Sequence, residues 1–272
     1  MRHERGRRYS SIVIGVLMLL LAGGMIFNVP QANLRWQKTY ERIMLALYPS
    51  AERAFQYGDR HFNALEPKEY DVAWAESLFD RAYALNPKLL HLQHERARIA
   101  FLKGDFAIAL ARIDAELALQ TTPSPDSYYI RGLIEGFAGE YDRAIVDYET
   151  YLRSDSKNWA AINDYAWVLL KANRPMDALI ALDWGLIYFP QNPWLLNSKA
   201  TALFELERLD RALVSAHDAA KWVDHVTEEQ WLRAYPGNDP LIAEMGIAEF
   251  KSAVLDNMHS IELAIKKERG DM

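Results

Sequence analysis

Residues 128–151 read YYIRGLIEGFAGEYDRAIVDYETY, and this stretch decides the fold. Its second half places Ala144, Tyr148 and Tyr151 at relative positions 0, +4 and +7, which lie on one face of an α-helix. Its first half contains Gly132, a small residue that lets a second helix backbone approach closely. Gly139 stands at the turn between the halves. The stretch therefore predicts two packed helices joined by a tight turn.

The same pattern recurs along the chain at a nearly constant interval. Each set begins with an alanine, and the leading alanines follow one another at intervals of 34, 35, 34 and 34 residues. A fixed period of this length over five units indicates an array of stacked helix pairs, because one pair alone cannot bury its apolar face. The five leading alanines are Ala75, Ala109, Ala144, Ala178 and Ala212.

Around these alanines the chain resembles the tetratricopeptide repeat (TPR) family, whose unit is a helix–turn–helix of about 34 residues. The third unit matches best, through Tyr128, Gly132, Gly139, Tyr141 and Ala144. The other units keep Ala97, Gly104, Phe106, Ala166, Pro190, Ala200 and Ala216, whereas Asn173 and Glu207 replace the turn glycine. The resemblance implies an all-α fold, a right-handed α-solenoid of about five TPR helix pairs over residues 50–226.

The composition limits the function classes. The chain has 272 residues, a net charge of −6 and no cysteine. It lacks the basic stripe of a nucleic-acid-binding protein, and it can form neither disulfides nor thiolate metal sites. We expect no nucleic acid and no small-molecule substrate among its partners.

The amino terminus predicts a membrane anchor. Residues 1–10 form a basic tail, and residues 11–29, SIVIGVLMLLLAGGMIFNV, carry no charge. A spanning helix needs about 20 mostly apolar residues, so we expect a transmembrane helix over residues 11–29. A cleaved signal peptide ending near Ala22-Gly23-Gly24 is the alternative. The excess of arginine before the run favours a cytoplasmic amino terminus and periplasmic repeats in a bacterial inner membrane.

Two flanking segments complete the predicted organisation. Residues 30–49 have helical spacing and are predicted to link the membrane to the array as a rigid continuation, and an amphipathic strip on the lipid surface is the alternative. Residues 227–272 depart from the repeat, and we expect them to form capping helices with a polar outer face. Thr227 begins a capping-box pattern, and two helices are predicted at 242–255 and 258–267.

No catalytic, cofactor or metal site is predicted. His91 and His94 are three residues apart but have no third ligand at a recognised spacing. Glu228 and Glu229 lie where acidic residues stabilise a helix start. No phosphate-binding glycine loop occurs.

The resemblance implies a binding groove along the first helix of each pair. Asn163 and Asn197 occupy the same repeat position, and their amides offer donors and acceptors to an extended peptide, with aromatic residues forming pockets. Solvated asparagines and aromatic packing between repeats are the alternative. The predicted groove residues are His94, Arg98, Phe101, Tyr129, Leu133, Phe137, Asn163, Trp167, Lys171, Asn197, Thr201 and Phe204.

These features predict a membrane-tethered scaffold, an adaptor or assembly subunit of a membrane protein complex. The alternative is a secretion-associated periplasmic chaperone-like factor that binds extended polypeptides. An enzyme with its site in residues 227–272 is a third hypothesis, disfavoured because so short a segment cannot supply both a core and a site.

Overall fold

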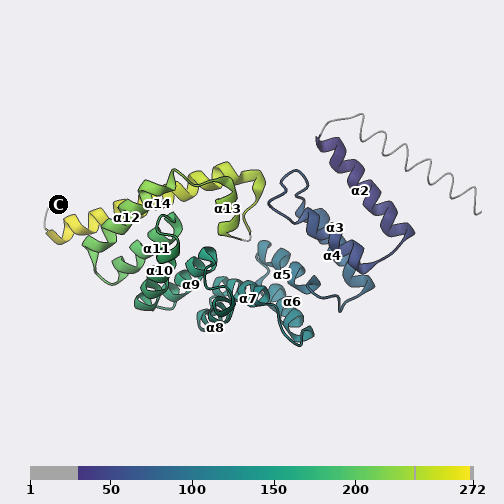
Figure 1. The fold of residues 1–272 in the computed structure, drawn as a ribbon, viewed down its shortest axis with the longest axis horizontal. Coiled ribbons are helices and arrows are strands. Elements are labelled where there is room, and N and C mark those ends of the chain that lie inside the picture. The colour runs from purple at the N-terminus through teal and green to yellow at the C-terminus, as the bar shows by residue number, and fades with distance from the viewer. Residues whose placement is uncertain (1–29, 236, 270–272) are drawn as a thin grey trace, which may run out of the picture. The chain divides into compact units, whose positions relative to one another are not determined.

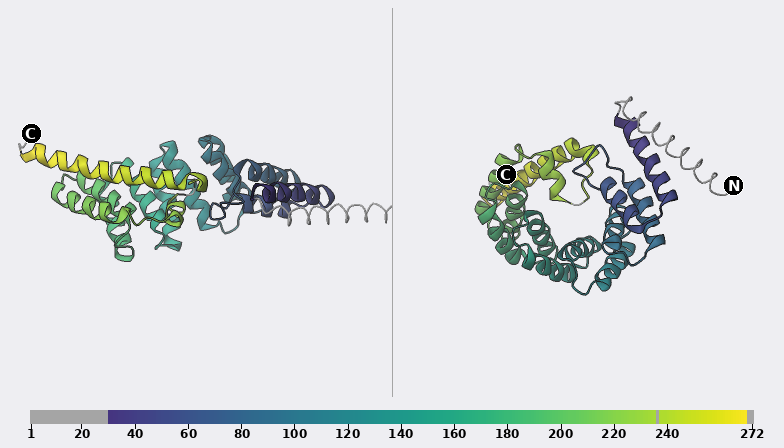
Figure 2. Two further views of the ribbon diagram at one scale, coloured as in Figure 1. Left: turned by 90° about the horizontal axis from the view of Figure 1, so that it is seen from above. Right: turned by 45° about the vertical axis from the view of Figure 1, so that its right-hand side comes forward.

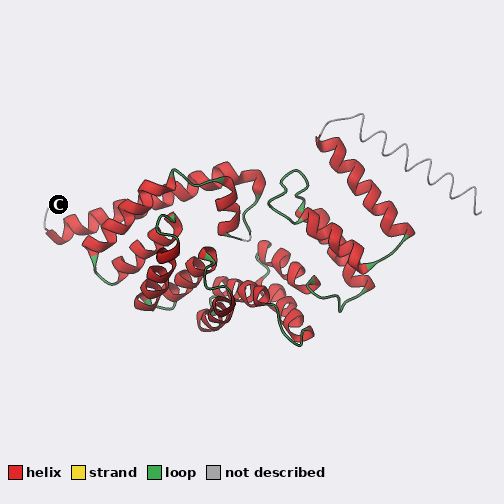
Figure 3. Ribbon diagram, viewed as in Figure 1, coloured by secondary structure: helices red, strands yellow, loops and turns green. Residues whose placement is uncertain are grey.

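The computed structural model describes residues 30–235 and 237–269, and their regular secondary structure is entirely helical (Figures 1 and 3). The predicted basic tail and transmembrane helix, residues 1–29, lie outside this part of the chain. Within the described part, no helix combines the length and apolarity required to cross a bilayer. The chain divides into two compact units, residues 1–89 and residues 90–272.

The first unit contains three described helices, α2 (Pro30–Leu47), α3 (Ala51–His61) and α4 (Val72–Leu85). Helices α3 and α4 form the first helix pair, and each begins at a side-chain cap, Ser50 and Asp71 respectively. Phe79 of α4 is fully buried against Gly58, where an added Cβ would lie 2.6 Å from the ring. A glycine is therefore required where these two helices meet.

A buried polar network ties α2 to this pair. The Glu41 carboxylate, which is fully buried, faces His61 Nε2 at 3.0 Å and accepts a hydrogen bond from Trp74 Nε1 at 2.8 Å. The Nδ1 atom of His61 lies 2.7 Å from the carbonyl oxygen of Glu69. One side chain from each of the three helices thus meets at a single buried point.

The second unit holds four further helix pairs, as predicted. The leading alanines Ala109, Ala144, Ala178 and Ala212, and the small residues Ala97, Ala166 and Ala200, are all completely buried. Close approach of the helix backbones is the physical reason for these residues. The helices are α5 (Leu92–Leu102), α6 (Phe106–Leu119), α7 (Pro125–Ala138), α8 (Tyr141–Ser154), α9 (Trp159–Lys171), α10 (Pro175–Tyr188), α11 (Pro193–Glu205) and α12 (Leu209–Val223).

The turns within these pairs share one backbone conformation. Gly104 and Gly139 have φ angles of 78° and 84°, and Asn173 and Glu207, at the equivalent positions, have φ angles of 58° and 57°. The left-handed region is costly for residues with a Cβ, least so for asparagine. Since nothing lies within 4 Å of a Cβ added at either glycine, backbone conformation and not space favours glycine there.

We expect Glu207→Gly to raise the free energy of unfolding by about 0.5–1 kcal/mol, because relief of the left-handed strain exceeds the added entropy of the unfolded chain. Chemical denaturation of both proteins measures the change. Glu205→Gly is the matched control, because Glu205 is the last residue of α11, has no left-handed φ, and a glycine in a helical conformation should destabilise. Equal destabilisation by both substitutions would contradict the expectation.

The carboxyl-terminal region differs from the prediction. Thr227 forms the expected capping box of α13 (Glu228–Ala234), and a 3-10 turn, η1 (Pro240–Ile242), follows. The prediction of two helices at 242–255 and 258–267 is wrong, because one helix, α14 (Ala243–Arg269), covers both ranges. No glycine or proline interrupts it between Leu255 and Met258.

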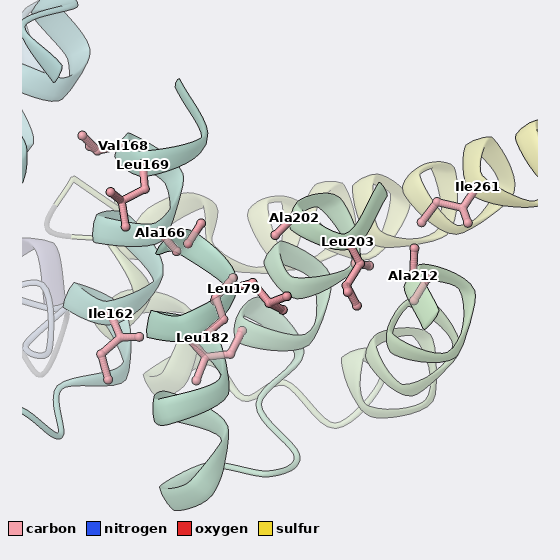
Figure 4. Close-up of a cluster of buried hydrophobic side chains, with 14 of the residues drawn as sticks. Ile162, Ala166, Val168, Leu169, Leu179, Leu182, Ala202, Leu203, Ala212 and Ile261 are labelled. Atoms are coloured by element: carbon pink, nitrogen blue, oxygen red, sulfur yellow. The ribbon is translucent and has the colours of Figure 1, made fainter. Parts of the chain in front are cut away.

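One face of α14 continues the apolar stripe without a break. Val254, Ile261 and Ile265 are buried, and Met258 packs beside them, with spacings of three to four residues. Ile261 lies beside Ala212 and Leu203 in the core of the last pair (Figure 4). The distal part of α14 therefore closes the array, as a cap should.

Candidate functional site

The predicted groove residues lie on α5, α7, α9 and α11, the first helices of the four pairs in the second unit. We call the side of these helices that carries them the inner face. The pairs follow an arc, and α13 lies on its inner side (Figures 1 and 2). The inner face is therefore not empty, because residues 228–235 and 237–250, here termed the C-terminal segment, fold back onto it.

Aromatic contacts fix the tip of this segment. The Tyr235 ring lies 6.0 Å from the rings of both Phe101 and Phe137, measured between centroids. Phe101 and Phe137 themselves meet edge to face at 5.3 Å. The following Gly237 approaches Leu102 so closely that an added Cβ would lie 2.8 Å from that side chain. Two predicted groove aromatics thus hold a polypeptide from the same chain.

The base of the segment is held by α11. The rings of Trp194 and Phe250 stack at 4.5 Å with an interplanar angle of 7°. Farther along α14, the Asn257 amide donates to the Asn197 side-chain oxygen at 2.8 Å and lies 3.3 Å from Thr201 Oγ1. These two predicted groove residues bond to α14, whereas binding of a foreign peptide by Asn163 and Asn197 stays a prediction.

A hollow of about 320 Å³ remains open between the inner face and the segment. It unites four of the predicted residues, Leu133, Phe137, Asn163 and Trp167. Sequence reasoning missed the rest of its lining, to which α9, α11, α13 and α14 all contribute. The missed residues are Asp164, Trp194, Ser198, Trp231, Ala234, Tyr235, Asn238 and Phe250.

The remaining predicted residues lie outside this hollow. His94 Nδ1 lies 3.0 Å from Ser127 Oγ, and burial lowers the pKa of His94. Arg98 pairs with Glu95 at 2.7 Å. Tyr129 does not line the hollow but donates a hydrogen bond to Asp164, which does. Lys171 and Phe204 are exposed at helix ends. In the described ranges, no three His, Asp or Glu side chains are placed to hold a metal ion.

Asp164 is the acidic residue of the hollow. Its Oδ2 accepts a hydrogen bond from the Tyr129 hydroxyl at 2.8 Å, and Asn163 is its second polar neighbour. Burial raises the pKa of the Asp164 carboxyl to about 7, although the hydrogen bonds from Tyr129 and Asn163 act in the opposite direction. The same burial raises the pKa of Tyr129 well above its usual value.

This pKa predicts a pH-dependent stability. Because the folded-state pKa lies above the unfolded value of 3.8, Asp164 favours folding below pH 4, and this contribution is lost as pH rises through about 7. Relative to Asp164→Asn, the wild type should lose about 1–4 kcal/mol of unfolding free energy between pH 4 and pH 8. Denaturant titrations of both proteins measure the difference, and parallel pH profiles would contradict it. Groups such as Glu135 titrate in both proteins and cancel.

A second candidate surface lies on α10, facing away from the core. A hollow of about 530 Å³ between α8, α9 and α10 is lined partly by Leu152, Tyr165 and Trp184. Beside it, exposed apolar side chains recur at helical spacing along the whole length of α10. They are Met176, Ile180, Trp184, Ile187 and Tyr188.

Comparisons with solved structures identify the architecture. A tetratricopeptide repeat protein from Parabacteroides merdae matches with a TM-score of 0.58 at 14% identity, covering 90% of this chain and 98% of its own. The chain has the TPR fold. The MamA protein matches with a TM-score of 0.53 at 16% identity, over 63% of this chain and 92% of its own. No protein-family model and no curated protein sequence matches the chain.

The TPR fold explains where the predicted groove residues lie. The first helix of each repeat presents side chains to the inner face. Residues chosen at equivalent positions of successive repeats therefore include Leu133, Phe137, Asn163 and Trp167, which line one hollow. The position of the C-terminal segment is a feature of this chain that repeat positions do not encode.

Proposed function

We propose that this protein is a scaffold that binds other proteins through the inner face of its TPR array and performs no catalysis. One observation carries the proposal: the inner face already binds a polypeptide, the C-terminal segment. The contacts are those of a peptide-binding surface: Tyr235 of the segment packs on Phe101 and Phe137, and farther along α14 the Asn257 amide donates a hydrogen bond to Asn197. A partner chain would use the open hollow beside the segment or compete with the segment for the same surface.

Membrane tethering is the second part of the proposal. Residues 11–29 carry no charge and reach the length of a spanning helix, and the arginines before them favour a cytoplasmic amino terminus. The array would then lie in the periplasm of a bacterium, held at the inner membrane. Such a protein would act as an adaptor or an assembly subunit of a membrane protein complex.

A chaperone-like factor is the second candidate, and the exposed apolar stripe on α10 favours it. A continuous apolar patch rimmed by polar residues marks an interaction site. A factor that binds extended apolar segments during secretion would use such a surface broadly. A dedicated adaptor would instead hold one partner through the inner face.

The test is purification from native membranes with a carboxyl-terminal tag, followed by mass spectrometry. We expect one stoichiometric partner in the wild type and its loss in Phe137→Ala, because Phe137 is 46% exposed on the inner face. Ile180→Ala on α10 is the matched control and should retain the partner. A broad set of exported proteins lost only in Ile180→Ala would support the chaperone, and the absence of any reproducible partner would overturn both. The same sample shows whether residues 1–24 remain attached, which separates an anchor from a signal peptide.

A further inference from the structure

The open hollow between the inner face and the C-terminal segment has an unusual lining. Half of the twelve residues that line it are aromatic, and they come from α7, α9, α11, α13, the loop after α13 and α14: Phe137, Trp167, Trp194, Trp231, Tyr235 and Phe250. Asp164 is the only charged residue in the lining, and no basic side chain contributes to it. The hollow thus presents aromatic rings together with a single acidic group.

We propose that this hollow binds the guanidinium group of an arginine from a partner polypeptide. The inference rests on the proposed scaffold function and specifies which side chain of the partner the inner face recognises. Aromatic faces attract cations through their quadrupoles, and arginine stacks on them better than lysine does. The planar guanidinium also matches a carboxylate with two parallel hydrogen bonds.

The electrostatics of Asp164 favour a cation. Asp164 as a whole residue is 9% exposed, and its polar neighbours, the Tyr129 hydroxyl and the Asn163 amide, are both neutral. A buried carboxylate without a counter-charge is costly, and a paired cation offsets that cost. Because the C-terminal segment brings only neutral groups to the lining, the counter-charge would have to come from another molecule.

The polar lining distinguishes arginine from a quaternary ammonium ion. A quaternary ammonium has no N–H group and needs only aromatic rings around it. Here Asn163, Ser198 and Asn238 also line the hollow, and their oxygens can accept hydrogen bonds from a guanidinium with five donors. The volume of about 320 Å³ lies at the lower end of the ~300–1,000 Å³ range of ligand pockets, which suits a single side chain.

The experiment measures peptide binding by the full-length protein in mild detergent, by calorimetry. The probes are the peptide Gly-Ser-Gly-Arg-Gly-Ser and the same peptide with citrulline, the neutral isostere of arginine. We expect the arginine peptide to bind about tenfold more tightly, and Asp164→Asn to abolish this preference. Trp167→Leu should weaken binding by a similar factor, through loss of an aromatic wall. Tyr48→Leu, an exposed aromatic residue of the first unit that does not line the hollow, is the control and should leave binding unchanged.

Equal affinity for the two peptides, or unchanged preference in a folded Asp164→Asn protein, overturns the inference. If Asp164→Asn does not fold, loss of binding in Trp167→Leu but not in Tyr48→Leu decides. Tighter binding of tetramethylammonium than of the arginine peptide overturns the assignment to arginine. If neither peptide binds but a partner is still lost on Phe137→Ala, this inference fails while the scaffold function stands. Asp164-dependent arginine binding without any reproducible partner would support the hollow and not the scaffold.

Discussion

Replacing Glu41 with alanine is expected to lower the free energy of unfolding of the first unit by about 3–5 kcal/mol, the cost of breaking a buried ion pair from one side. The Glu41 carboxylate is fully buried and receives a hydrogen bond from Trp74 Nε1 at 2.8 Å. It also faces His61 Nε2 at 3.0 Å, and both residues are fully buried at this contact. Alanine would leave the His61 and Trp74 donors without this acceptor.

The charge of His61 makes this loss large. Both ring nitrogens face oxygen acceptors, Glu41 on one side and the Glu69 carbonyl on the other, so the doubly protonated ring satisfies both. Burial alone would lower the pKa of His61, but the hydrogen bonds to Glu41 and Glu69 outweigh it and raise the pKa. The pair therefore stabilises the unit below the unfolded pKa of histidine, and this contribution is lost as pH rises through the raised value.

Hydrogen exchange of the α3 and α4 amides in the full-length protein measures the effect on this unit alone. Glu66→Ala is the matched control, because Glu66 is exposed in the loop between α3 and α4 and should change stability by no more than about 0.5 kcal/mol. If the two substitutions have the same effect, or if Glu41→Ala costs as much at pH 8 as at pH 5, the network does not carry the stability assigned to it.

The repeats could be predicted from the sequence because their physical causes are local and periodic. A small residue is needed at each helix crossing, and the buried Ala97, Gly132, Ala166 and Ala200 recur where the backbones meet. The left-handed turns are also local, and Glu207 shows that the architecture imposes this conformation even without glycine.

The Glu41 network and the C-terminal segment could not be predicted in this way, because their contacts are distant in sequence and occur once. His61 and Trp74 follow Glu41 by 20 and 33 residues, and no period relates them. Trp231, Tyr235 and Phe250 were a signal that the segment packs against something, since a polar cap has little use for three large aromatic residues. Nothing in the sequence indicated that their partners lie on α7 and α11.

Four of the twelve residues that line the hollow were accordingly predicted. Choosing residues at equivalent positions of successive repeats finds those that point to the inner face, and Phe137, Asn163 and Trp167 therefore meet at the hollow. Asp164 follows Asn163 directly and was missed, because neighbouring positions of a helix normally point in different directions. In this chain the C-terminal segment and α9 both line the hollow, so that Asp164 as well as Asn163 faces it.

Trp231→Ala is expected to free α13 from the start of α14 and so loosen the C-terminal segment, at a cost of about 3–5 kcal/mol in the free energy that holds α13 in place. Trp231 is 8% exposed, and its ring packs on Gly246 so closely that an added Cβ would lie 2.0 Å from ring carbon Cζ2. The ring thus joins α13 to the start of α14.

Hydrogen exchange of the full-length protein measures this release. Protection should fall in α13 and residues 237–245, while α7 to α10 keep theirs, because the core of the array does not depend on the segment. Trp184→Ala is the matched control, since Trp184 is 46% exposed on α10 and its removal should leave the segment docked. Unchanged protection in Trp231→Ala would mean that Tyr235 and Phe250 hold the segment without it.

Because the released segment uncovers Phe101 and Phe137, a partner that competes for the same surface should bind the Trp231→Ala protein more tightly than the wild type.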